Sequence, residues 1–292
     1  MPTKSSPGFG GLAAEFRNPK TAQIAVLPVA YDKTSTWKKG ADKGPAALIA
    51  ASANMELYDI PTRSEVYRRG IHTLAPINFR GSPENLADKV QKAMGGLLDS
   101  GKFPVLLGGE HSVSIGAFRA AAAKYVGSLS ILQIDAHADT REEYLGSRCN
   151  HACVMARARE LCPITQIGIR AIDAEEAPNL DHSRVFFAHE IAGRLDHSGG
   201  WIDLAVRQQR ENVYVTIDLD GFDPSLVPAT GTPEPGGLSW AQVNSLLEKL
   251  TAERRVIGFD VVELLPKADL WASDFVAAKL VYRFLSMIFA GR

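Results

Sequence analysis

The chain has 292 residues, of which 46% are hydrophobic and 22% charged, the composition of an ordinary globular protein with a substantial core. Its formal net charge is -1, so no overall field would draw it to nucleic acid or to an anionic membrane. No stretch approaches the roughly 18 uninterrupted apolar residues of a membrane span, and the N-terminus lacks the apolar run of a secretory signal. We therefore expect a cytoplasmic protein that binds neither nucleic acid nor membrane.

Short apolar and β-branched runs recur along the chain and alternate with longer segments of helical spacing. In chain order the predicted strands are 23–29, 103–108, 129–135, 164–169, 184–189, 213–218 and 255–263. The predicted helices are 85–99, 114–124, 239–252 and 273–289. Several strands are apolar on both faces, which is typical of strands buried between two helical layers. The pattern predicts a single α/β domain over 1–292, with a mostly parallel sheet and helices on both faces.

Acidic and imidazole side chains gather where three of these strands end. They are His111 in LLGGEHS, then Asp135, His137 and Asp139 in LSILQIDAHAD, and Asp218 and Asp220 in VYVTIDLDGFDP. Residues i and i+2 of an extended chain project to one side, so each motif presents its side chains together. A carboxylate that ends an apolar strand is costly to bury without a partner, and a cation is the usual partner. Ligands of such sheets collect at this edge.

Each motif alone has a plainer reading: the D-x-D pair as a surface turn, the glycines of GGEH as a tight turn. Together at three strand ends they predict a metal site. Two imidazoles and four carboxylates are too many for one catalytic zinc, which usually takes three protein ligands. They suit two ions such as Mn²⁺, bridged by carboxylates and sharing a hydroxide nucleophile. Thiolates fit poorly beside four carboxylates, so Cys149, Cys153 and Cys162 are interpreted as free thiols.

With these motifs in view, the sequence resembles the ureohydrolases, the family of arginase and agmatinase. The blocks that carry the resemblance are, in order, GGEHS, DAHAD, the later His151, IDLDGFDP followed by GTPEPGGL, and Glu263 in DVVELLP. The resemblance extends from 31–45 to 272–280. It is strongest to agmatinase, through 140–157 and GTPEPGGL, although that branch usually has serine where this chain has Asn150. It implies an arginase-like three-layer α-β-α fold with about eight strands, and a homo-oligomer, trimer or hexamer.

The same resemblance implies how the ligands divide between two Mn²⁺ ions per chain. One ion would be held by His111, Asp135, Asp139 and Asp218. The other would be held by Asp135, His137, Asp218 and Asp220. Asp135 and Asp218 would then bridge the two ions.

The charge of the filled site indicates the kind of substrate. Two divalent cations cancel four aspartates, and a bridging hydroxide together with Glu263 leaves about two net negative charges, which favours a small cationic substrate. A guanidinium group is always charged near neutral pH and offers a fork of donors that a carboxylate accepts in pairs. We expect Glu263 to bind the guanidinium group. The alternative is that Glu263 is a glutamate at a strand end that lies on the surface or only supports the metal ligands.

The resemblance also assigns the proton chemistry. Hydroxide attacks the guanidinium carbon, and Asp139, besides acting as a ligand, is expected to orient it. The leaving amine must be protonated, and a histidine, with an ordinary pKa of about 6.5, is suited to carry that proton. His151, in the block N-H-A, is the residue expected to do so and to contact the substrate.

The leading hypothesis is hydrolysis of agmatine to putrescine and urea. The alternatives are another linear guanidino or formimino compound, such as 4-guanidinobutyrate, or a single-zinc deacetylase-like amidohydrolase. Arg141 stands where the arginase branch typically has asparagine, so it could grip a substrate carboxylate or pair with Glu142 or Glu143. The segment 223–237, rich in proline and glycine, is expected to form an ordered loop that walls the pocket.

Overall fold

The computed structural model describes residues 8–193 and 200–290, so residues 1–7, part of the N-terminus examined for a signal, lie outside it. The described strands form one sheet in the order β2-β1-β4-β9-β8-β5-β6-β7, and β3 also pairs with β1. Every pairing between strands is parallel. The strands are β1 (Ile24–Ala30), β2 (Ile71–Thr73), β3 (Ile77–Asn78), β4 (Phe103–Gly108), β5 (Leu129–Ile134), β6 (Ile164–Ile169), β7 (Val185–Phe187), β8 (Asn212–Asp218) and β9 (Arg255–Val262).

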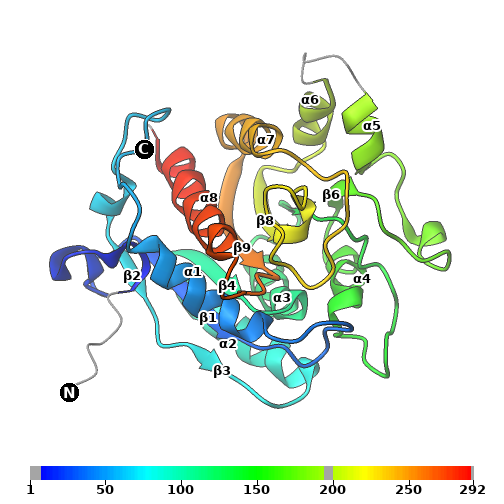
Figure 1. The fold of residues 1–292 in the computed structure, drawn as a ribbon, viewed down its shortest axis with the longest axis horizontal. Coiled ribbons are helices and arrows are strands. Elements are labelled where there is room, and N and C mark those ends of the chain that lie inside the picture. The colour runs from blue at the N-terminus through cyan, green and yellow to red at the C-terminus, as the bar shows by residue number, and fades with distance from the viewer. Residues whose placement is uncertain (1–7, 194–199, 291–292) are drawn as a thin grey trace.

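Helices cover both faces of this sheet (Figure 1). They are α1 (Gly44–Ser52), α2 (Pro83–Asp99), α3 (Ser114–Lys124), α4 (Val154–Arg159), α5 (Ala188–Gly193), α6 (Gly200–Arg207), α7 (Trp240–Glu253) and α8 (Trp271–Phe289). Buried apolar side chains of α1, α6, α7 and α8 share one large core cluster with the sheet. Those of α2, α3 and α4 form the second, on the opposite face. The predicted three-layer α/β architecture with a parallel sheet is therefore confirmed.

The longer predicted elements agree with the structure to within a few residues. The helix predicted after Ser239 begins there because the Ser239 hydroxyl accepts a hydrogen bond from the backbone N–H of Gln242, whose side chain accepts from the backbone of Ser239. The strand predicted at 184–189 was too long, since Ala188 begins α5. Strands β2 and β3 and the helices α1, α4, α5 and α6 were not predicted, because strands of two or three residues and helices of six to nine residues carry little periodic pattern.

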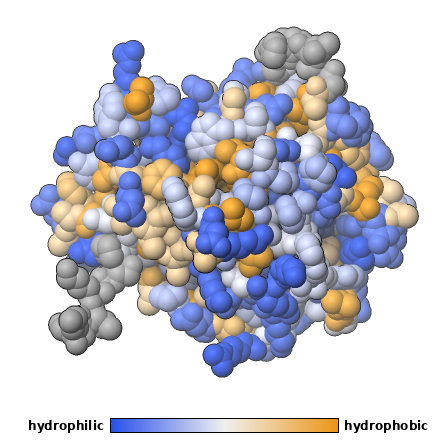
Figure 2. All heavy atoms as spheres, viewed as in Figure 1, coloured by the Kyte–Doolittle hydropathy of each residue, from blue (hydrophilic) through white to orange (hydrophobic). Residues whose placement is uncertain are grey.

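None of the described helices is long and apolar enough to cross a membrane. Figure 2 shows hydrophilic residues spread over the viewed face, with smaller apolar areas between them. Cys149, Cys153 and Cys162 are free thiols, and the first two are buried.

Strand order explains why residues distant in sequence meet. The four central strands β4, β9, β8 and β5 are immediate neighbours and all point the same way. Each of the three predicted metal motifs, and Glu263, lies at or just after the end of one of these four strands. The carboxyl ends of four adjacent strands therefore deliver the predicted residues to one place.

Candidate metal centre

A cavity of about 320 Å³ opens at the carboxyl ends of the central strands. Seven of the eight predicted site residues line it, namely His111, His137, Asp139, His151, Asp218, Asp220 and Glu263. The eighth, Asp135, is fully buried among them. The 223–237 segment contributes Gly231, Thr232 and Glu234 to the wall, as predicted for an ordered loop.

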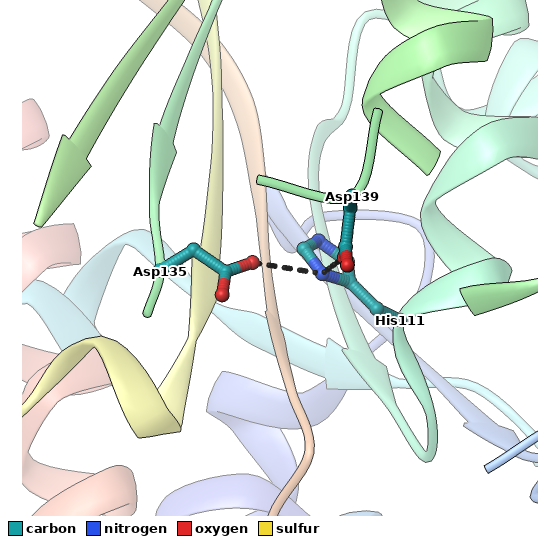
Figure 3. A group of neighbouring side chains, drawn as sticks. All are labelled: His111, Asp135 and Asp139. Carbon is teal, nitrogen blue, oxygen red and sulfur yellow. Dashed lines mark ion pairs between the residues drawn. The ribbon is translucent and has the colours of Figure 1, made fainter. Parts of the chain in front are cut away.

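The first cluster surrounds the imidazole of His111. Its Nδ1 lies 3.1 Å from Oδ2 of Asp139, 3.2 Å from Oδ2 of Asp135 and 3.5 Å from Oδ2 of Asp218. Figure 3 shows the carboxylates of Asp135 and Asp139 converging on this ring from two different directions. Their ligand atoms lie within 4.8 Å of one another, close enough to hold one ion.

The protonation of His111 tests whether these residues suit a cation. Its Nε2 lies 2.8 Å from Oγ1 of Thr216, which donates its own proton to Asp260 at 2.6 Å. The hydroxyl oxygen can therefore only accept from His111, which places the ring proton on Nε2 when the imidazole is neutral. The buried Nδ1 has no hydrogen-bond partner within the described part of the chain. A lone pair facing three carboxylates is the arrangement of a metal ligand.

The second cluster lies beside the first and shares Asp135 with it. Nδ1 of His137 lies 3.0 Å from Oδ2 of Asp220 and 3.7 Å from Oδ1 of Asp135. These three residues form the second group whose ligand atoms lie within 4.8 Å of one another. The turn after β8 can approach β5 so closely because residue 221 is glycine, where a Cβ would lie 2.8 Å from the backbone nitrogen of Asp135.

The carboxylates of both clusters are buried close to one another, and this shifts their pKa values. Burial and the neighbouring Asp135 raise the pKa of Asp139 to about 6, and burial, Asp220 and Asp135 raise the pKa of Asp218 well above its usual range. Burial also acts to raise the pKa of Asp135, but the neighbouring imidazoles of His111 and His137 outweigh burial and lower it. Like charges this close stabilise a cation between them, so the donor set fits two metal ions.

Two buried amides hold Asp135 in place, and sequence analysis did not identify either. Nε2 of Gln133 donates to Oδ2 of Asp135 at 2.7 Å and to the carbonyl of His137 at 3.2 Å. Gln166, on the neighbouring strand β6, donates to Oε1 of Gln133 at 2.7 Å and to the carbonyl of Ala138 at 2.8 Å. A buried glutamine inside an apolar strand was the available signal, because such an amide requires partners.

Glu263 lines the cavity and has a constrained backbone. Its φ is 64°, in the left-handed region that residues other than glycine rarely adopt, and Asp139 is the other site residue there, with φ of 53°. Oε1 of Glu263 accepts the backbone N–H of His111 at 2.7 Å. Oε2 points to the space left by Gly231, where a Cβ would be 3.9 Å away. One carboxylate oxygen thus remains for a ligand in the cavity.

His151 stands on the wall of the same cavity, in a turn that Asn150 caps by accepting a hydrogen bond from Ala152 N–H at 3.1 Å. Asparagine and serine are both good capping residues, so Asn150 preserves this turn where serine is usual. Nδ1 of His151 lies 3.3 Å from Oγ1 of Thr34. Burial, together with the neighbouring His111 and His137, lowers the pKa of His151 to about 4. The ring is therefore neutral near pH 7.

Arg141 makes ion pairs, but not with the expected partners. It lies 3.0 Å from Asp173 and 3.3 Å from Glu175, and its guanidinium stacks over the ring of Tyr144 at 4.5 Å. Glu142 instead pairs with Arg157 at 2.7 Å. The suggested pairing of Arg141 with Glu142 or Glu143 was therefore wrong, because the loop after β6 supplies acidic partners that local sequence does not reveal.

A buried carboxylate next to the first cluster was also missed. Glu110, one residue before His111, accepts hydrogen bonds from the 31–40 loop, which forms part of the cavity wall. The close contact depends on Gly109, where a Cβ would lie only 2.0 Å from the carbonyl oxygen of Tyr31. The signal was the GGEH motif itself, whose glycines permit a close backbone approach.

Comparisons with known proteins place this geometry in context. The family model described as "Arginase family" matches residues 22–286. The N(1)-aminopropylagmatine ureohydrolase of Synechocystis is 38% identical over 274 residues, covering 90% of this chain and 88% of that protein. The agmatinase of Pyrococcus horikoshii is 32% identical, covering 92% and 93%. The crystal structure of the agmatine ureohydrolase of Thermoplasma volcanium superposes with a TM-score of 0.85 at 32% identity, covering 94% and 93%.

Proposed function

The chain belongs to the arginase family and is a ureohydrolase, a hydrolase of C–N bonds in linear amidines, and from that premise we propose that it converts agmatine to putrescine and urea. The observation that carries the proposal is a cavity with two acid and imidazole clusters that share Asp135, and with the partly buried Glu263 beside them. That arrangement favours a positively charged group in front of two metal ions.

We assign the metal ions as Mn²⁺, held by His111, Asp135, Asp139 and Asp218 and by Asp135, His137, Asp218 and Asp220. Hard carboxylate oxygens with two imidazoles suit this ion. When bound, such a pair lowers the pKa of water so that hydroxide is available near neutral pH. The shared position of Asp135 and the three-way approach of carboxylates to His111 support the division of ligands.

Glu263 is proposed to bind the guanidinium. One of its oxygens is occupied by the backbone N–H of His111, so Oε2, beside the gap at Gly231, accepts from the substrate. Burial and the neighbouring Glu110 raise the pKa of Glu263, which a cationic substrate would reverse by pairing with the ionised form. A planar guanidinium held this way presents its carbon to the clusters.

His151 is proposed to carry the proton. Because its ring is neutral, it accepts a proton as water attacks the guanidinium carbon, while Asp139 orients that water. The proton then passes to the leaving nitrogen as the C–N bond breaks, and the second proton of the water follows from the oxygen, which gives urea and an amine in its ammonium form. Water thus supplies the oxygen of urea and both protons gained by the amine.

The mouth of the cavity favours an amine tail over a carboxylate tail. Besides the residues already assigned, its charged lining consists of Asp173, Glu176 and Glu234 against Lys38 and Arg141. Arg141 already forms ion pairs with Asp173 and Glu175, so its guanidinium is not available to bind a substrate carboxylate. A guanidino acid such as 4-guanidinobutyrate would meet excess negative charge, whereas the ammonium of agmatine would be attracted.

A second candidate is N(1)-aminopropylagmatine, a longer amine with the same guanidinium end. Several similar proteins, from Synechocystis and Thermus thermophilus, bear its name. The acidic mouth would attract its additional positive charge as well. Hydrolysis would release urea and a triamine.

Urea release from a panel of compounds tests these proposals. The Mn²⁺-loaded protein is incubated with agmatine, N(1)-aminopropylagmatine, 4-guanidinobutyrate and arginine, and kcat/KM is measured for each. We expect agmatine to be hydrolysed with a higher kcat/KM than either acid. A preference for N(1)-aminopropylagmatine would select the second candidate, a preference for 4-guanidinobutyrate would refute the role given to the acidic mouth, and no urea from any guanidine would refute the function.

A further inference from the structure

The hydroxyl of Thr34 connects His151 to the buried Glu110. Its oxygen lies 2.6 Å from Oε1 of Glu110, 3.1 Å from the backbone nitrogen of His151 and 3.3 Å from Nδ1 of the same histidine. A hydroxyl has one proton to donate and two lone pairs with which to accept. Three partners therefore use its full capacity. Which partner receives its single proton decides where His151 carries its own.

Glu110 receives that proton. The backbone N–H groups of Thr34 and Ser35 donate to its Oε2 at 2.5 and 2.8 Å, and the Ser112 hydroxyl donates to its Oε1 at 2.5 Å. With Thr34, each carboxylate oxygen has two close donors, the pattern of an ionised carboxylate that only accepts. The lone pairs of Thr34 Oγ1 then accept the backbone N–H and the Nδ1–H of His151.

From this hydrogen-bond count we infer that Thr34 and Glu110 are positioning residues that fix the tautomer of His151, with the proton on Nδ1 and Nε2 unprotonated. The inference rests on the proposed role of His151 as proton carrier. In this tautomer Nε2 takes the proton that water loses and later returns it to the leaving nitrogen. The opposite tautomer would turn the Thr34 proton toward His151 and leave two lone pairs facing each other across the 2.6 Å contact with Glu110.

The hydrogen bonds around Glu110 indicate that the substitution Glu110→Gln should reverse the tautomer of His151. In Glu110→Gln the amide oxygen must take the place of Oε2, because the two backbone N–H groups there can only donate. The amide NH₂ then takes the place of Oε1 and donates to Thr34, whose own proton turns toward Nδ1 of His151. The histidine proton consequently moves to Nε2. Thr34→Ser preserves the hydroxyl and serves as the matched control, and Thr34→Val removes it at nearly the same volume.

Nuclear magnetic resonance of the full-length chain measures the tautomer without reference to activity. With ¹⁵N-labelled histidine and diamagnetic Zn²⁺ in place of Mn²⁺, proton–nitrogen correlations distinguish protonated from unprotonated ring nitrogens, and His151→Ala assigns the signal. We expect protonated Nδ1 in the wild type and in Thr34→Ser, and protonated Nε2 in Glu110→Gln. Protonated Nε2 in the wild type, or an unchanged tautomer in Glu110→Gln, would overturn the inference.

Kinetics of the Mn²⁺-loaded variants link the tautomer to the reaction. We expect kcat to fall on the order of 100-fold in Glu110→Gln and Thr34→Val, with KM and metal content close to the wild type, because the loss lies in proton transfer. Thr34→Ser should retain most of kcat. Full kcat in Glu110→Gln with a reversed tautomer would refute the link. A wild type that releases no urea would instead refute the proposed function and leave the tautomer result standing by itself.

Discussion

The floor and the rim of the cavity come from different parts of the fold. The floor, defined as the six candidate metal ligands and Glu263, follows directly from four adjacent parallel strands and is largely buried. The rim comes from loops far apart in the chain, and we define it as residues 35–38, Arg141, Asp173, Glu176, Thr232 and Glu234. Trp37 on the rim is 66% exposed, whereas Asp135 on the floor is 0% exposed.

The difference separates reaction type from substrate choice. The sheet fixes the floor, because moving one carboxylate would require moving a strand buried on both faces. Loops form the rim and can change in length and charge at little cost to the core. We infer that the floor determines the reaction, hydrolysis of a guanidinium group. The rim determines which guanidinium-containing amine is bound as substrate. Substitutions on the floor should therefore have large effects on reaction and metal, and those on the rim small effects on substrate preference.

The largest effect is expected from Asp135→Ala. Asp135 contacts both imidazoles, at 3.2 Å from His111 and 3.7 Å from His137, so its loss should remove both metal ions and reduce urea release below detection. Metal content per chain, measured by mass spectrometry on the purified protein, is the test. Asp88→Ala is the matched control, because Asp88 is an exposed aspartate on α2, outside the cavity, that pairs with Arg119. Two ions per chain remaining in Asp135→Ala would disprove a shared ligand.

A smaller effect is expected from Thr216→Val, which leaves every ligand in place. Thr216 accepts from Nε2 of His111 and donates to Asp260, so it fixes which nitrogen of the ring faces the candidate metal site. Removing such support typically lowers metal affinity about 10- to 100-fold. We expect weaker Mn²⁺ binding in a titration, with activity recovered at saturating Mn²⁺.

Thr165→Val is the control for Thr216→Val. Thr165 is equally buried, on β6, but its hydroxyl accepts a 3.4 Å hydrogen bond from Arg184 and does not contact His111. Its loss should leave Mn²⁺ affinity unchanged. Equal affinities in the two variants would show that the hydroxyl of Thr216 has no part in holding His111.

The floor could be predicted from the sequence because its motifs are local. Each lies where an apolar run ends, and parallel strands bring such ends together without knowledge of strand order. The structure brings Asp135, Asp139 and Asp218 around His111, in agreement with that reasoning. Their roles as ligands stay a prediction, as do the single domain over the whole chain and the trimer or hexamer.

The supporting contacts and the rim could not be predicted, for a physical reason. Thr34 and Glu110 are 76 residues apart, and Gln133 and Gln166 are 33 apart. Neither pair belongs to a periodic pattern, so only the folded chain shows that they meet. The same holds for Arg141, whose partners Asp173 and Glu175 lie more than 30 residues away. Such pairings depend on loop conformation, which strand and helix periodicity does not encode.

The smallest effect is expected on the rim, from Glu234→Gln. Glu234 is partly exposed at the mouth of the cavity, where a charge contributes about 0.2–1 kcal/mol to a pairing, so KM for agmatine should rise roughly 1.4- to 5-fold with kcat unchanged. The increase should shrink at high salt, because exposed charges are screened. Glu248→Gln, an exposed position on α7, should change neither constant. A fall in kcat or in metal content in Glu234→Gln would show that the rim takes part in the reaction and that the division between the two regions is false.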